Sequence, residues 1–175
     1  MYQVDNKDKV TELKDVPQSS VGAPLPIILS NEHKLYLAYY LQNTPPDWNG
    51  KTVRVEDSET EDYIALVEFE KYESFMFGSP NDEAFHGHPL ANRGLEPYTV
   101  FEIENSSWLR NLEKMNSVHP YHKPEKFEKL KHFVFAFHDS TFECIAENFN
   151  ISISKGSIKS VLEEMKEKLH SWWES

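Results

Sequence analysis

The chain has 175 residues, of which 39% are hydrophobic and 13% aromatic, and this size and composition predict a single domain with an ordered core. Its one cysteine cannot form an internal disulfide, which favours a reducing compartment. The net charge of −11 argues against binding to nucleic acid, because the chain would repel phosphates.

No apolar run approaches the roughly 20 residues that span a bilayer, so we expect no membrane contact. The polar, charged N-terminus resembles neither a signal peptide nor a transit peptide, and we therefore expect a cytoplasmic protein. The charge is unevenly distributed. Residues 54–104 carry 13 acidic and 3 basic side chains, whereas residues 110–131 carry 6 basic and 3 acidic ones.

Residues 1–20 are highly charged and have no sustained periodicity, which predicts a flexible N-terminal arm before a single α+β domain over residues 21–175. We expect the ordered structure to begin near Ala23. Apolar alternation and aromatic-rich runs predict strands at 25–29, where Pro26 favours an edge position, and at 34–42, 51–56 and 63–77. Turns or loops separate these strands at 30–33, 44–50 and 57–62.

The longest irregular stretch, 78–97, contains prolines and glycines that break regular elements, and loops of this length are often functional. After a strand at 98–104, Asn105 or Ser106 is expected to cap a helix. A second, short helix is predicted at 124–130. Strands at 132–138 and 141–146 form a hairpin, and a strand at 149–153 precedes a C-terminal helix that Ser157 caps. The pattern predicts a mainly antiparallel sheet of about six strands with two or three helices.

Candidate binding residues first occur in the long loop, at His86, His88, Asn92 and Arg93. One interpretation is a pocket for a small molecule or anion that uses Arg93. The other is that one imidazole bonds the loop backbone and the second is solvated. His86 and His88 would share one side of an extended segment and are candidate metal ligands, with further ligands from His119, His122 or His138.

A second set of candidates lies at the tip of the predicted hairpin, in residues 137–144. His138 and Asp139 join the predicted ligand-binding residues, and His138, Asp139 and Glu143 are candidate acid–base groups. Cys144 is a candidate nucleophile, although a free cysteine in an apolar strand usually packs as a small hydrophobic residue. Asp and Ser also occupy turns for structural reasons, so a purely structural tip is the alternative.

The third candidate is the segment 119–124, which lies near Lys114, Lys123 and Lys126 and could receive a phosphate or carboxylate. The alternative is a proline-stiffened connector between two helices. The Trp172–Trp173 pair is interpreted as core packing with one exposed ring. No glycine-rich phosphate loop, paired Cys-x-x-Cys motif or dinucleotide fingerprint is present, so no cofactor is predicted.

Several strings resemble a family of small uncharacterised bacterial proteins, over about residues 23–153. They are Asn105-Ser106-Ser107-Trp108, Met115-Asn116-Ser117-Val118-His119-Pro120, His132-Phe133-Val134-Phe135 and Phe137-His138-Asp139-Ser140-Thr141-Phe142-Glu143-Cys144-Ile145-Ala146. The resemblance implies a bacterial origin. It carries over no activity and no functional residue.

The leading hypothesis is a non-enzymatic binding or accessory protein that recognises a small anionic ligand or a protein partner through residues 85–95 and 137–143. The runner-up is a hydrolase or lyase that uses His138, Asp139 and Glu143, with a metal on His86 and His88. A third hypothesis is an immunity or inhibitor protein that presents the acidic region 54–104 to a basic partner. A homodimer is a further candidate assembly.

Overall fold

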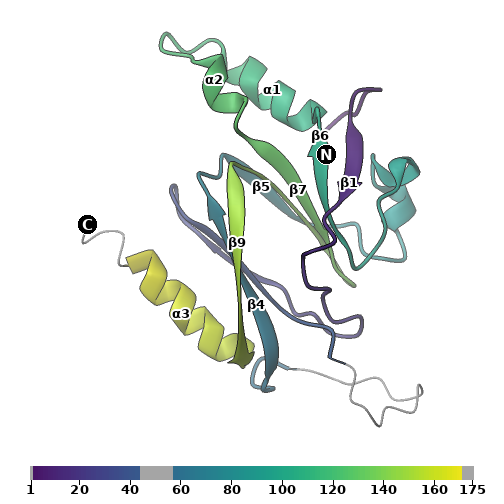
Figure 1. The fold of residues 1–175 in the computed structure, drawn as a ribbon, viewed down its shortest axis with the longest axis vertical. Helices are drawn as coiled ribbons and strands as arrows, with labels where there is room; N and C mark the ends of the chain where they lie inside the picture. Colours follow the sequence, from purple (N-terminus) through teal and green to yellow (C-terminus); the bar gives the residue numbers. More distant parts are fainter. Residues whose placement is uncertain (1, 44–56, 171–175) are drawn as a thin grey trace. The chain divides into compact units, whose positions relative to one another are not determined.

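The computed structural model describes residues 2–43 and 57–170, which form two compact units (Figure 1). The first unit comprises Met1–Val16 and Lys71–Asn148, and the second comprises Pro17–Glu70 and Phe149–Ser175. Within the described residues there are nine strands in two antiparallel sheets and three α-helices. The α+β class and the C-terminal helix are confirmed, but the strands are more numerous than the expected six and form two sheets.

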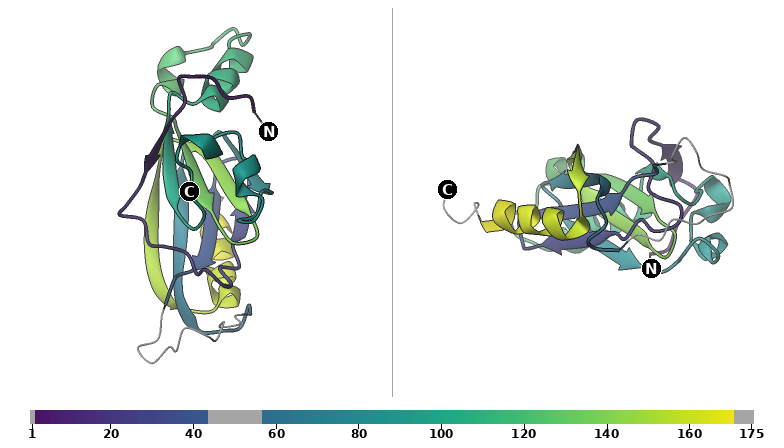
Figure 2. Two further views of the ribbon diagram at one scale, coloured as in Figure 1. Left: turned by 90° about the vertical axis from the view of Figure 1, so that its right-hand side faces the viewer. Right: turned by 90° about the horizontal axis from the view of Figure 1, so that it is seen from below.

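The first unit is built on a five-stranded antiparallel sheet in the order β1-β6-β7-β8-β5. The bounds of its strands are Lys9–Glu12 for β1, Ser74–Gly78 for β5, Val100–Glu104 for β6, Lys131–Ala136 for β7 and Thr141–Ala146 for β8. Its helices are α1, Ser107–Asn116, and α2, Pro124–Phe127, which lie beyond one end of the strands (Figure 2). The segment between β5 and β6 contains two short 3-10 turns, η1 at Phe85–Gly87 and η2 at Ala91–Arg93.

The long loop of the first unit is ordered because its apolar side chains complete a core. Phe85, Leu90 and Leu95 are buried against the face of the sheet that carries Phe101 and Val134. Tyr2, Val4 and Val10 of the N-terminal segment pack against the same cluster. The loop and the N-terminal segment therefore cover one face of the sheet and exclude water from it.

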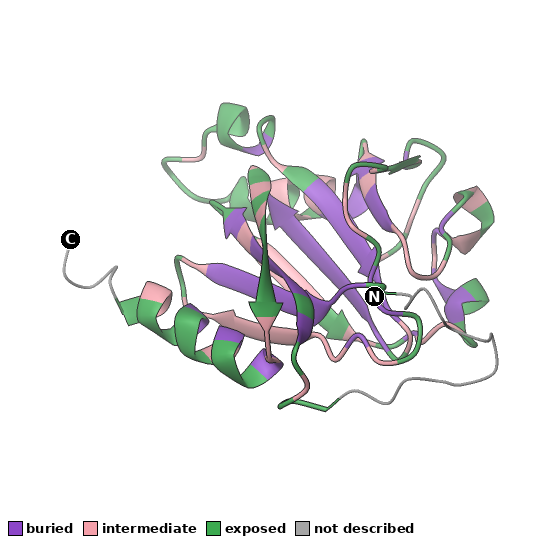
Figure 3. Ribbon diagram, turned by 60° about the horizontal axis from the view of Figure 1, so that its bottom comes forward, coloured by how far each residue is buried: buried purple, intermediate pink, exposed green. Residues whose placement is uncertain are grey.

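The second unit has a four-stranded sheet in the order β2-β3-β4-β9, covered by one helix. The bounds are Ile27–Ser30 for β2, Leu35–Tyr40 for β3, Asp62–Glu70 for β4, Asn148–Gly156 for β9 and Ile158–His170 for α3. The apolar stripe of α3, formed by Ile158, Val161 and Met165, packs on the side chains of β3 and β4. Burial is concentrated in β3 and β4, whereas most of β9 and much of α3 are exposed (Figure 3).

Most predicted elements are confirmed, including the edge position of β2, the hairpin of β7 and β8, and the α1 cap, where Leu109 N donates to Ser106 Oγ at 3.2 Å. One predicted strand is wrong. The segment 63–77 is divided into β4 and β5, which belong to different sheets, and Lys71 between them has a positive φ of 47°.

Two further expectations concern the first 23 residues and the undescribed segments. Ordered structure begins earlier than Ala23, because β1 lies within 1–20 and is paired with β6. The predicted loop at 44–50, the predicted strand at 51–56 and the Trp172–Trp173 pair lie outside the described residues.

Among residues 2–43 and 57–170, no helix is long and apolar enough to cross a membrane.

Candidate functional site

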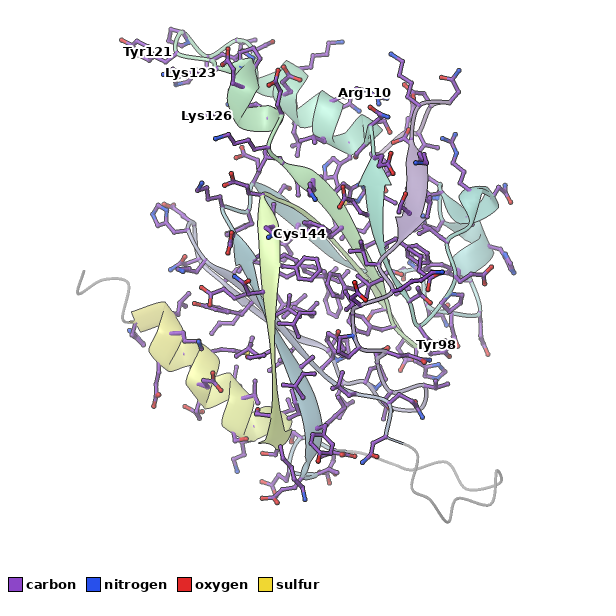
Figure 4. All side chains as sticks on the ribbon, in the orientation of Figure 1. Tyr98, Arg110, Tyr121, Lys123, Lys126 and Cys144 are labelled. Carbon is purple, nitrogen blue, oxygen red and sulfur yellow. The ribbon has the colours of Figure 1, made fainter. Side chains whose placement is uncertain are left out.

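The segment 78–98 contacts residues 137–144 at both of its ends, through Asp82 and Tyr98, and from its middle through His88, which lies beside Glu143. The backbone N–H of Asp82 donates to the carbonyl of His138 at 2.9 Å, and the Thr141 hydroxyl donates to the carbonyl of Pro80 at 2.8 Å. From the other end, Tyr98 reaches the ring of His138 (Figure 4 labels Tyr98).

Tyr98, Asp82 and His138 form a partly exposed polar cluster at this tip. Nδ1 of His138 lies 2.9 Å from Oδ2 of Asp82 and 3.0 Å from the Tyr98 hydroxyl, which also donates to Asp82. The hydrogen bond from Tyr98, with a further contribution from His138, lowers the pKa of Asp82 although partial desolvation opposes this. Burial, followed by the neighbouring Asp82 carboxylate, raises the pKa of Tyr98. These hydrogen bonds hold the segment 78–98 against the turn at His138.

The predicted ligand-binding residues of the long loop face different surroundings. His86 and Asn92 are exposed, whereas His88 is 3% exposed. The guanidinium of Arg93 donates to the backbone carbonyls of Asp5 and Asp8, the latter at 2.8 Å. The structure therefore does not bring His86, His88 and Arg93 to one concavity.

The tip residues are also dispersed. The Asp139 side chain is 87% exposed, and its Oδ1 lies 4.0 Å from Nε2 of His138. Cys144 is fully buried in β8, where burial raises the pKa of its thiol and disfavours the reactive thiolate. Glu143 belongs to a separate, buried cluster on the face of the sheet that the loop covers.

Glu143 is the centre of this cluster and accepts hydrogen bonds from three chain segments. Its Oε1 lies 3.2 Å from Nε2 of His88, and its Oε2 lies 2.9 Å from Nε2 of His132. The Tyr2 hydroxyl donates to Oε2 at 2.6 Å. The side chain of Glu143 is 4% exposed and those of both histidines are 0% exposed, so these donors replace the hydration that the carboxylate loses.

The partners of the two histidines indicate where their protons lie. Leu90 N–H donates to Nδ1 of His88 at 3.1 Å, so the proton of the neutral ring is on Nε2 and is donated to Glu143. Ser106 Oγ lies 2.9 Å from Nδ1 of His132 and already accepts from a backbone N–H, so its own hydrogen is available to that ring nitrogen. Burial would raise the pKa of Glu143, but the hydrogen bonds from His132 and His88 outweigh it and hold the pKa at about 2.

This arrangement is that of a buried carboxylate surrounded by hydrogen-bond donors. A metal on Nε2 of His88 would need the ring proton on Nδ1, but Nδ1 accepts from Leu90 N–H. Across the described ranges, no group of three or more His, Cys, Asp or Glu side chains could hold a metal ion. His119 Nδ1 accepts from Tyr121 N–H at 3.1 Å, and His122 Nδ1 lies 2.8 Å from Oδ1 of Asn116.

The third predicted segment lines a cavity of about 680 Å³ at the end of the first unit that carries α1 and α2. We call it the lysine cavity, and its lining is Lys71, Glu73, Asn116, His119, Tyr121, Lys123, Glu125, Lys126, Phe127, Lys129, Leu130 and Glu147. Figure 4 shows Tyr121, Lys123 and Lys126 on one side of the α1–α2 region, far from Tyr98.

The lysine cavity contains cationic groups that are not neutralised by partners. Lys71 is paired with Glu147 at 2.5 Å, and the hydrogen bond from Lys71 lowers the pKa of Glu147. Lys123 and Lys126 are exposed, and neither makes an ion pair or a side-chain hydrogen bond with another described residue. With four lysines and three glutamates in the lining, the formal charge of the cavity is +1 in a chain of −11.

Local sequence explains why this region is held in place. Ser106 caps α1. Trp108 anchors the helix on the sheet: its ring stacks on that of Tyr2, with 5.6 Å between the ring centroids, and makes a T-shaped contact with His132, with 5.1 Å between the centroids. Pro124 begins α2 at a position where its missing N–H is no loss, and Phe127 is buried beneath it. Lys123 of the connector and Lys126 of α2 are therefore carried by a segment that is held in place at both ends.

No family model, no curated protein and no solved structure matches the chain. The resemblance to a bacterial family consequently stays a prediction.

Proposed function

We propose that the protein is a non-enzymatic binding protein that holds an anionic group, a phosphate or a carboxylate, in the lysine cavity. One observation carries this proposal. Lys123 and Lys126 both line the lysine cavity, both are exposed, and neither ammonium group has an ion-pair partner among the described residues. Lysine ammonium groups bind phosphate and carboxylate as compact point charges.

The cavity suits a ligand in size as well as in charge. Its volume of about 680 Å³ is within the range of roughly 300–1,000 Å³ that ligand pockets have. Tyr121, Phe127 and Leu130 add apolar lining beside the lysines. Arg93 was the anion-binding candidate of the long loop, but its guanidinium is engaged by backbone carbonyls, which favours Lys123 and Lys126 as the anion site.

We also propose a cytoplasmic location. This is supported by the single cysteine, Cys144, which is buried and free, as expected of a protein that needs no disulfide.

Titration calorimetry with inorganic phosphate tests the proposal. We expect the double substitution Lys123→Gln and Lys126→Gln to weaken phosphate binding by about tenfold or more, because each lost charge removes on the order of 1 kcal/mol. The matched control is Lys159→Gln with Lys166→Gln on α3, two lysines that are paired with Glu59 and Glu163. Absence of phosphate binding by the wild type, or equal weakening in the control, would contradict the proposal.

A further inference from the structure

Three large apolar side chains lie exposed within seven residues at the end of α1 and in the connector that follows it. Met115 is 64% exposed, Val118 is 87% exposed and Tyr121 is 82% exposed. Single exposed apolar residues are normal on protein surfaces, whereas a local group of them marks a surface for a partner. Elsewhere in the described part of the chain, the large exposed apolar residues come from separate segments, at Val21, Tyr63, Phe77 and Ile153.

These apolar side chains adjoin the basic part of an acidic protein. Residues 110–131 have a local charge of +3, and Tyr121 itself lines the lysine cavity. Lys114, near the end of α1, and Lys123, at the end of the connector, are exposed. A partner that matches this surface must carry acidic groups and apolar groups close together.

The overall charge limits the length of such a partner. The net charge of −11 repels an extended polyanion such as nucleic acid or an anionic bilayer, because these feel the field of the whole protein. A short segment feels chiefly the charges within a Debye length, about 8 Å at physiological salt. The local charge of +3 over residues 110–131 therefore favours a short acidic segment over an extended polyanion.

We propose that the anion held in the lysine cavity is a side-chain carboxylate of an acidic polypeptide segment, whose neighbouring apolar side chain packs on Met115 and Val118. This inference depends on the proposed function, since it names the partner of the same cavity. The carboxylate is placed between Lys123 and Lys126. The apolar side chain of the segment covers the surface that α1 and the connector leave in water.

Fluorescence anisotropy with two labelled peptides tests the partner. One is a short run of glutamates interrupted by leucine and phenylalanine, and in the other alanines replace these two residues. We expect the first peptide to bind about tenfold more tightly than the second. The double substitution Met115→Ser and Val118→Ser should remove this difference and leave phosphate affinity unchanged, because neither residue lines the cavity.

The outcomes separate the two proposals. If phosphate binds but the two peptides bind equally, or if the Met115→Ser and Val118→Ser variant keeps the preference, the polypeptide partner is overturned and the anion site stands. If phosphate does not bind the wild type, both proposals fail. Preferential binding to vesicles of anionic lipid, measured by co-sedimentation, would also overturn the polypeptide partner.

Discussion

Replacing Glu143 with Gln is expected to lower the free energy of unfolding by about 3 kcal/mol or more at pH 7. The carboxylate accepts from His88, His132 and Tyr2 at once, and it is buried. A carboxamide has only one oxygen, so its NH₂ group would face an N–H of one imidazole. Urea denaturation of the two proteins measures the loss.

The same variant should change the dependence of stability on pH. The pKa of Glu143 is lowered in the folded protein from an ordinary value of 4.5 to about 2, so its contribution is complete above pH 4.5 and is lost as the pH falls toward 2. The difference corresponds to about 3 kcal/mol. We expect wild type to lose this stability between pH 5 and pH 2 and Glu143→Gln to lack that component.

The control for this prediction is Glu164→Gln, which removes an exposed ion pair with Lys168 on α3 and should cost less than about 0.5 kcal/mol. Equal stability of wild type and Glu143→Gln would show that the buried cluster does not hold the carboxylate as described.

Replacing Trp108 with Ala is expected to cost about 3–5 kcal/mol, the range for removing a large buried aromatic side chain. The ring is 8% exposed and is stacked on Tyr2 and packed on His132, so its loss leaves α1 without its anchor. Since α1 and the connector carry part of the lysine cavity, we also expect weaker phosphate binding. Thermal unfolding and phosphate titration of the variant measure the two effects.

Met115→Ala on the same helix is the matched control, because the side chain is 64% exposed and its removal should change stability by no more than about 0.5 kcal/mol. A Trp108→Ala protein with unchanged stability would contradict the role given to the ring. If the variant is destabilised but binds phosphate as tightly as wild type, the lysine cavity does not depend on the packing of Trp108.

The hairpin and the two longer helices could be predicted because each has a local signal. In the hairpin, apolar residues alternate on both sides of an Asp-Ser turn, and in α1 a serine cap precedes a one-sided apolar stripe. The break at Lys71 carries no glycine or proline, so the turn had no strong local signal. The only signal was the run of mostly polar residues over 70–74. The assignment of β4 and β5 to two sheets depends on pairing between distant segments, which local periodicity does not encode.

Less of the candidate site could be predicted. The approach of the segment 78–98 to the hairpin tip was anticipated, but Asp82 and Tyr98 were not, since neither stands in a recognisable motif. The buried role of Glu143 had a signal that was not used, namely a charged residue at a core-facing position of an apolar strand. The lysines were visible as a basic segment. The hollow they line arises only when Lys71 and Glu73, which precede β5, and Glu147, which follows β8, come beside the α1–α2 region.

NMR can show which residues surround the bound anion. Uniformly ¹⁵N-labelled protein can be titrated with inorganic phosphate while its backbone amide resonances are followed by NMR. We predict progressive, saturable shifts in residues 116–130 and in the neighbouring Lys71 and Glu147. Shifts confined to residues 85–95 and 137–143, or no saturable shift at all, would contradict an anion site in the lysine cavity.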